Sequence, residues 1–325
     1  MNKKIIDDIV WWIPFKKLRN AVRGFLILIY NINDNLIDIN NNLININNKM
    51  DTQLSVINYT VYNINETFSK HINLKKIEND PKRLENYVYK LYSQNDEDGI
   101  INEIFNRIGT TNKFFIEFGV QDGIECNCHY LLFQGWEGVF IEGSKDYCDK
   151  INEYYEYLIS KSKLQVINAF ITRENINDLI YTTKAIDIID IDLLSIDIDG
   201  NDYNVFKAID IINPRVVIIE YNVKFPPPVK WVMPYNANHI WDYTEKQGAS
   251  LESIVDLAKE KGYELVATNI SGVNAFFVRK ELYNKDIFQE NNSAKNLNNF
   301  LLYHWHGHQT YKKFLENSLE FDRDI

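Results

Sequence analysis

Two glycines and a carboxylate end the apolar run 114–119, and this combination can hold a small charged ligand. Gly119 closes the run, Gly123 follows it in the next turn, and Glu117 comes just before Gly119. Glycine lets the backbone turn tightly beneath a ligand. Glu117 would repel a pyrophosphate but suits a ligand that carries a cationic sulfonium and an ammonium group. The spacing also differs from the Gly-x-Gly-x-x-Gly loop of dinucleotide-binding proteins, although a generic turn between strand and helix could carry the same glycines.

Polar side chains at the ends of the next two runs predict a nucleoside-binding edge. Glu142 ends the second run and Ser144 follows it, while Asn168 and Ala169 follow the third run. In open α/β sheets a carboxylate at the end of the second strand accepts hydrogen bonds from ribose hydroxyl groups. The edge of an adenine ring would then lie at Asn168 and Ala169. A solvated loop acid at Glu142 and a turn-capping amide at Asn168 are the alternatives.

Carboxylates gather at the ends of two further runs. Asp197 and Asp199 flank one apolar residue, and Glu220 and Asn222 end the following run. In an extended chain Asp197 and Asp199 face the same side and repel each other unless a cation or a proton lies between them. Oxygen ligands suit Mg²⁺ or Ca²⁺ better than zinc. These four residues are a candidate metal set, and the alternative is that Asp197 orients the cofactor or the acceptor without a metal.

Histidines supply the remaining candidates for chemistry. His239 follows the stiff segment 226–228, and a histidine there could serve as a general base, although a structural surface histidine fits equally well. His304, His306 and His308 share one face of an extended segment and could bind a metal. The adjacent glycine and the C-terminal location favour an aromatic, polar tail that packs on the protein instead.

The elements that must position these residues alternate between β-rich runs and helical stretches. Such alternation predicts a doubly wound, mostly parallel sheet whose ligands bind at the carboxyl ends of the strands. Only five residues separate the last two runs, so we expect a hairpin and an antiparallel final strand. The seven predicted strands are 114–119, 138–142, 164–170, 193–198, 216–221, 264–269 and 275–279.

Residues 29–64 show a different periodicity, with apolar residues at alternating spacings of three and four and one extra step of four at Met50 that indicates a stutter. Leu36 and Leu43 fall at a positions of a heptad, and Ile32 and Ile39 fall at d positions. The polar residues between them make a poor isolated helix, so the seam needs a partner. Leucine at a with isoleucine at d favours more than two strands and predicts a trimer or tetramer. The alternative is that this helix folds back on the α/β domain.

The segment 9–30 places aromatic residues beside basic ones. Trp11, Trp12 and Phe15 are followed at once by Lys16 and Lys17. This combination suits the boundary of an anionic lipid layer and predicts peripheral membrane contact. Packing against the protein's own oligomer is the alternative.

Composition narrows the class of protein. The net charge of −10 argues against nucleic acid as a partner. Three cysteines without a paired CxxC spacing fit a reducing compartment. Asp7 and Asp8 follow the first lysines, and no small-residue cleavage site appears, so we expect no signal peptide. We also expect no transmembrane helix, and a cytoplasmic protein whose basic segment allows peripheral contact with the inner face of the cell membrane.

Five segments in order resemble the FkbM-like methyltransferases: 93–99, 115–123, 139–144, 194–202 and 219–222. The resemblance covers about residues 84–283. It implies a methyltransferase-type Rossmann sheet, S-adenosylmethionine as the methyl donor, O-methylation and a sugar-containing acceptor. Asp199 stands where the family often has glutamate, which keeps the charge and shortens the reach.

Together these observations predict four segments: a basic aromatic segment 1–28, a coiled coil and linker 29–80, a methyltransferase domain 81–285 and an extension 286–325. The predicted function is O-methylation of a saccharide or sugar nucleotide in the biosynthesis of a surface polysaccharide, such as capsule or lipopolysaccharide. A non-catalytic coiled-coil assembly protein with a degenerate methyltransferase domain is the rival. A nicotinamide-dependent oxidoreductase is disfavoured because the dinucleotide loop is missing.

Overall fold

The computed structural model describes residues 3–11, 13–77, 80–188, 190–241, 246–270 and 272–297. The chain divides into two compact units, Met1–Asn63 and Ile64–Ile325, which are described separately. The predicted histidines His304, His306 and His308 lie outside the described residues, as does Trp12.

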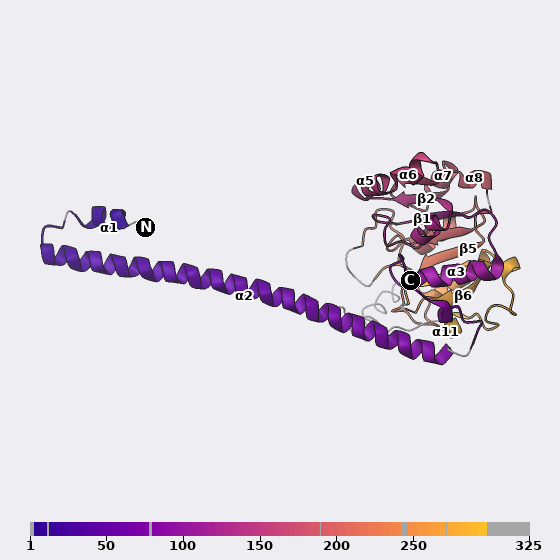
Figure 1. Cartoon of the computed structure of the whole chain (residues 1–325), viewed down its shortest axis with the longest axis horizontal. Helices are drawn as coiled ribbons and strands as arrows, with labels where there is room; N and C mark the ends of the chain where they lie inside the picture. The colour runs from indigo at the N-terminus through magenta and orange to yellow at the C-terminus, as the bar shows by residue number, and fades with distance from the viewer. Residues whose placement is uncertain are drawn as a thin grey trace. The chain divides into compact units, whose positions relative to one another are not determined.

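The first unit consists of a short helix and the greater part of a very long one. Helix α1 spans Lys3–Val10, and helix α2 spans Lys16–Ile77 and so continues into the second unit. Pro14 lies between the two helices, which agrees with its inability to continue a helix. Figure 1 shows α2 as one uninterrupted helix, which is compatible with the predicted coiled coil.

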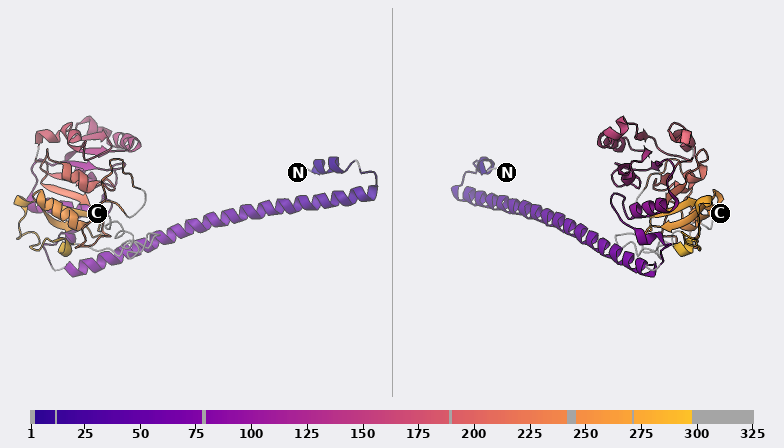
Figure 2. Two further views of the ribbon diagram at one scale, coloured as in Figure 1. Left: turned by 180° about the vertical axis from the view of Figure 1, so that it is seen from behind. Right: turned by 45° about the vertical axis from the view of Figure 1, so that its right-hand side comes forward.

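Helix α1 lies beside the first turns of α2 (Figures 1 and 2). Its residues Ile6 and Val10 are buried, although the described part of this unit offers only α2 for them to pack against. Arg19 donates to the carbonyl oxygen of Ile13 at 2.8 Å, and Arg23 pairs with Asp7 at 2.6 Å. Two basic side chains of the segment 9–30 therefore stabilise the helical hairpin that α1 and α2 form.

The second unit is built on a seven-stranded sheet in the order β3-β2-β1-β4-β5-β7-β6. Strands β1 to β5 are parallel, and β7 is antiparallel to both β5 and β6. This confirms the predicted doubly wound sheet with a terminal hairpin. The strands are β1 Phe114–Phe118, β2 Glu137–Glu142, β3 Leu164–Asn168, β4 Leu193–Ile196, β5 Val216–Glu220, β6 Tyr263–Thr268 and β7 Asn274–Arg279.

Helices cover both faces of the sheet, because alternate residues of each buried strand point to opposite sides. In β1, Ile116 and Phe118 belong to a core shared with α7 to α10, whereas Phe115 belongs to a core shared with α3, α4 and α5. The helices are η1 Leu84–Tyr87, α3 Glu97–Ile108, α4 His129–Phe133, α5 Lys145–Tyr154, α6 Glu156–Ser160, α7 Ile176–Tyr181, α8 Ala185–Ile188, α9 Asp202–Ala208, α10 Leu251–Glu260, η2 Lys280–Leu282 and α11 Ala294–Leu297.

Candidate active site

A cavity of about 770 Å³ opens at the carboxyl ends of β1, β4 and β5. Ligand sites of doubly wound sheets lie at this edge, and the volume falls in the range of roughly 300–1,000 Å³ that is usual for ligand pockets. Its lining is strongly acidic. The acidic side chains are Glu117, Asp122, Glu125, Asp197, Asp199 and Glu220.

Gly119 fixes the distance between β1 and β4 at the floor of this cavity. Its φ is +71°, and a β-carbon added to it would lie 1.7 Å from the carbonyl oxygen of Asp197. Only glycine permits both the left-handed backbone and this close approach. Gly123 also has a positive φ of +77°, and its carbonyl oxygen accepts a hydrogen bond from the Tyr155 hydroxyl at 2.6 Å. The turn predicted from the two glycines is present, and their contact with a cofactor stays a prediction.

Glu117 organises the segment that follows the glycine turn. One carboxylate oxygen accepts from the backbone N–H of Asn127 at 2.8 Å, and the other accepts from the N–H of Cys128 at 2.9 Å. The Ser195 hydroxyl donates to the same carboxylate at 3.2 Å. Burial raises the pKa of Glu117, and the backbone hydrogen bonds work to lower it. Glu117 lines the cavity. Its carboxylate therefore faces any ligand bound there, although both of its oxygens already accept hydrogen bonds from the protein.

Glu142 lies one hydrogen bond away from the cavity. Its carboxylate accepts from the N–H of Gln121 at 2.9 Å and from the N–H of Ser144 at 2.8 Å, and Gln121 itself lines the cavity. Asn168 donates to the carbonyl oxygen of Glu142 at 3.0 Å, and Ala169 donates its backbone N–H to the same carbonyl at 3.0 Å. The structure thus brings the four predicted nucleoside contacts together beside the cavity, although none of the four lines it.

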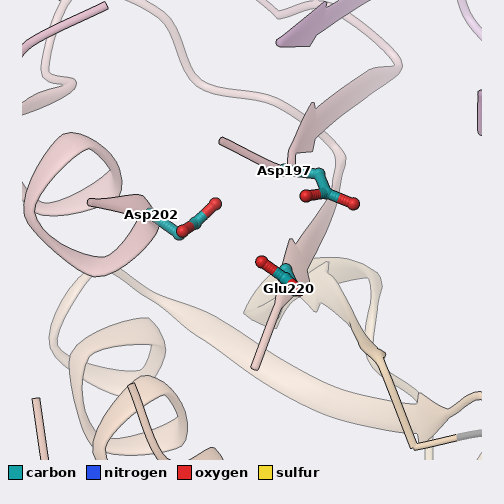
Figure 3. Close-up of side chains that lie close together, drawn as sticks. All are labelled: Asp197, Asp202 and Glu220. Atoms are coloured by element: carbon teal, nitrogen blue, oxygen red, sulfur yellow. The ribbon is translucent and has the colours of Figure 1, made fainter. Parts of the chain in front are cut away.

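Three carboxyl groups face one another at the ends of β4 and β5 and the start of α9 (Figure 3). Asp197, Asp202 and Glu220 each offer an oxygen atom within 4.8 Å of the other two. Burial and the neighbouring carboxylates raise the pKa values of Asp197 and Glu220 well above their ordinary range. Burial also raises the pKa of Asp202 to about 6. Three such carboxyl groups cannot all be ionised unless a cation lies among them, and without a cation at least one of them holds a proton.

This cluster shares Asp197 and Glu220 with the predicted metal set, and the binding of a metal stays a prediction. Asp202 replaces Asp199 in the cluster, and its oxygens accept from the N–H groups of Ile198 and Gly200 at 2.8 and 2.9 Å. Asn222 lines the cavity, but its side-chain oxygen already accepts from the backbone N–H of Lys224 at 3.1 Å. The sequence contains one signal for Asp202 that the prediction missed. It is an acidic residue in the first turn of a helix, two residues after Gly200.

The hydrogen bond between Asp199 and His239 joins the backbone of Asp199 to the ring of His239. His239 Nε2 lies 3.0 Å from the carbonyl oxygen of Asp199, and its ring packs on Gly200. A nitrogen that donates to a carbonyl cannot accept a proton at the same time. His239 is also outside the cavity lining. Its role as a base stays a prediction that this geometry does not favour.

The segment 93–99 ties the cavity to the β6–β7 hairpin, a role that the sequence did not reveal. The side chain of Glu97 accepts from Asn269 at 2.7 Å and from Asn274 at 3.0 Å, and Asn274 lines the cavity. The backbone N–H of Asp98 donates to the Ser93 hydroxyl, and the Asp98 carboxylate accepts from the Ser93 N–H at 3.0 Å. These acids hold the rim of the cavity together.

Residues 176–265 match the model of the methyltransferase FkbM domain. The match confirms the resemblance over β4, α9 and β5, which carry Asp197, Asp202 and Glu220. This part of the chain is therefore similar to a methyltransferase domain, in agreement with the predicted resemblance. Strands β1 and β2, with the glycine turn and Glu142, lie outside the matched residues.

Solved structures of methyltransferases are similar to this chain at low sequence identity. A putative caffeoyl-CoA O-methyltransferase from Staphylococcus aureus shares 12% identity with a TM-score of 0.40, covering 65% of this chain and 99% of that one. An O-methyltransferase from Bacillus cereus in complex with SAH shares 14% identity with a TM-score of 0.36, covering 55% of this chain and 76% of that one. No curated protein matches the sequence.

Replacing Gly119 by alanine should disrupt the site far more than an ordinary glycine substitution. Gly135 is the matched control, because its φ is +80° and nothing lies within 4 Å of the position that a β-carbon would take there. Both variants suffer the backbone strain of about 1–2 kcal/mol, but only Gly119→Ala also collides with Asp197. We expect Gly119→Ala to lose donor binding in calorimetry while Gly135→Ala retains it. Equal affinities in the two variants would contradict this role of Gly119.

The carboxyl cluster predicts a pH dependence of stability. A carboxyl whose pKa is higher in the folded state stabilises the fold below its unfolded pKa, and this contribution is lost as pH rises through the folded pKa. The free energy of unfolding should therefore fall as pH rises from about 4 through the Asp202 pKa of about 6, and the raised pKa values of Asp197 and Glu220 add to this fall. Glu220→Gln should flatten this fall in urea denaturation.

The same measurement separates a proton from a metal ion. If protons compensate the cluster, adding Mg²⁺ or Ca²⁺ at pH 8 should leave the free energy of unfolding of the wild-type protein unchanged. A stabilisation by either cation that is absent in Glu220→Gln would instead support the predicted metal site, with Asp202 among its ligands.

Proposed function

We propose that this chain is an S-adenosylmethionine-dependent O-methyltransferase that acts on a saccharide hydroxyl. The observation that carries the proposal is the close approach of Gly119 to the backbone of Asp197 at the floor of an acidic cavity. Gly119 belongs to the glycine turn, where the methyl donor would bind, and we call this turn the donor turn. The donor turn and the proposed acceptor residue therefore share one site. This arrangement supports a reaction between two ligands at the carboxyl edge of the sheet.

The residues of the site fit the proposed cofactor by their charge. Glu117 and Asp122 bring negative charge to a cavity that must hold a sulfonium and an ammonium group. Glu142 would accept from the ribose hydroxyls, and Asn168 with Ala169 would border the adenine. When bound, the cofactor supplies a methyl group that is already activated by its cationic sulfur.

The chain's own contribution to the reaction is orientation and removal of one proton. In the proposed step the acceptor oxygen forms a bond to the methyl carbon as the carbon–sulfur bond breaks, and the hydroxyl proton passes to Asp197. Because burial and the neighbouring carboxylates raise the pKa of Asp197, its ionised form is a stronger base than an ordinary aspartate. Most of the acceleration would come from holding the two ligands in line.

Asp197→Asn should abolish methyl transfer and leave donor binding largely intact. The amide keeps the shape of the side chain but cannot accept the proton, so the transition state loses more than the ground state. Donor affinity is measured by calorimetry with S-adenosylmethionine and with NAD, and turnover is measured by release of S-adenosylhomocysteine. Asp210→Asn, at an exposed position, is the control and should behave as wild type. Binding of NAD alone would contradict the proposal.

The rival function, a non-catalytic assembly protein, rests on α2 rather than on the cavity. It predicts that Asp197→Asn and the wild type are equally inactive and bind no donor. The intact glycine turn and the carboxyl cluster favour the enzyme, because an unused site has no need to bury mutually repelling acids.

We also propose that α2 forms a homo-oligomer through its apolar seam, as a trimer or tetramer. Leu36 and Leu43 on the seam are exposed in the single chain, and a helix of this composition gains stability by burying them. Replacing both by lysine should lower the mass measured by mass photometry. Ile37 and Ile44 are similarly exposed but lie off the seam, so the same double replacement there should leave the mass unchanged. Equal effects of the two pairs would contradict this register.

We propose, finally, that the hairpin of α1 and α2 contacts the inner face of the cell membrane. Trp11 is 72% exposed and Phe15 is 71% exposed, and Lys16 and Lys17 follow directly. None of the helices that the structure describes is both long enough and apolar enough to cross a bilayer. Co-sedimentation with vesicles containing phosphatidylglycerol should exceed that with phosphatidylcholine alone, and Trp11→Ser with Phe15→Ser should remove the difference.

A further inference from the structure

A group of aromatic rings lies at the surface of the second unit, formed by the segment before α3 and by α4 and α5, with Tyr154 joined to the other rings through the buried His129. The Tyr92 ring centroid lies 5.1 Å from that of Phe133 and 6.2 Å from that of Tyr130, with both pairs stacked. Tyr130 in turn lies 6.4 Å from Tyr89. Phe133 is 65% exposed and Tyr154 is 61% exposed, so the group presents ring surface to solvent.

Buried contacts hold these rings in place. His129 is buried beneath them, with ring centroids 4.3 Å from Tyr92 and 6.4 Å from Tyr154. Its Nδ1 lies 2.6 Å from the carbonyl oxygen of Ile124, and the Asp98 carboxylate accepts from the Tyr92 backbone N–H at 2.7 Å. Since the rings are already ordered, a ligand that stacks on them loses little side-chain entropy on the protein.

The ring group borders the acidic cavity. Gln94, two residues after Tyr92, lines the cavity, and so does Ile124, whose carbonyl holds His129. Glu125 also lines the cavity and pairs with Lys90, the neighbour of Tyr89, at 3.7 Å. A ligand lying on the rings can therefore extend into the cavity where methyl transfer is proposed.

We propose that the surface formed by Tyr89, Tyr92, Tyr130, Phe133 and Tyr154 binds a saccharide chain and presents one of its hydroxyl groups to the cavity. The presentation of a hydroxyl group for methyl transfer rests on the proposed function, whereas the binding of the saccharide to the rings does not. Aromatic faces pack against the C–H faces of sugar rings, while tyrosine hydroxyls bond to sugar hydroxyls.

The charge of the surface favours a saccharide over a lipid or a nucleic acid. Lys90, a basic residue beside Tyr89, is paired with Glu125 at 3.7 Å, so a carboxylate compensates part of its charge. Clustered exposed apolar groups are typical of interaction surfaces and ligand-binding grooves, whereas single exposed rings need no explanation. The mixture of rings and hydroxyls also differs from the aliphatic seam of α2, which suits another copy of the chain.

The test is affinity electrophoresis of the full-length protein in gels that contain dextran, mannan or alginate. We expect retardation in at least one gel, and about a tenfold weaker interaction for Phe133→Ala and for Tyr154→Ala, the loss of one ring contact. Tyr181→Ala is the matched control, because Tyr181 is 69% exposed on α7 and has no place in the ring group. It should be retarded like the wild type.

Donor binding is measured in parallel to keep this inference separate from the proposed function. Phe133→Ala and Tyr154→Ala should bind S-adenosylmethionine as the wild type does. Saccharide binding without any donor binding would overturn the methyltransferase proposal and leave this surface standing. Absence of retardation in every gel, or an equal loss in Tyr181→Ala, would overturn the saccharide surface. A drop in oligomer mass in Phe133→Ala, without a change in retardation, would assign the rings to a second copy.

Discussion

The close approach of β1 and β4 at Gly119 is the constraint on which the rest of the site depends. The order of the sheet makes β1 and β4 neighbours, and the chain leaves β1 in one direction along the sheet and β4 in the other. At that division the backbone of Asp197 nearly touches Gly119. The Glu117 carboxylate then holds the segment after the turn. The close contact between Gly119 and Asp197 therefore joins the glycine turn to the carboxyl cluster.

The central strands β1, β4 and β5 could be predicted from the sequence because they are buried on both faces and form nearly continuous apolar runs, whereas β3 is only partly buried. The residues at their ends followed from the same reasoning, and Asp197 and Glu220 do meet. Asp202 could not be found this way, since it belongs to a helix and reaches the cluster by folding back onto the turn before it. The links from Glu97 to Asn269 and Asn274 were also hidden, because they join residues far apart in the chain.

The N-terminal helix illustrates what periodicity can and cannot determine. Its alternating spacings predicted a long helix, and α2 is one. Nothing in those spacings indicated that α1 would fold back on its first turns, because Ile6 and Val10 form too short a pattern to be distinguished from chance. The hairpin depends instead on Pro14 and on the ion pair of Arg23 with Asp7, which act only once the chain has turned.

The carboxyl cluster also links the occupancy of the cavity to the acidity of the medium. Protons and a cationic ligand would both neutralise Asp197, Asp202 and Glu220, so they would compete for the same negative charge. A cation that entered the cavity would displace protons into the buffer, and the heat of association would then include the buffer's own heat of protonation. The apparent enthalpy of association would differ between phosphate and Tris for this reason alone, in proportion to the protons released.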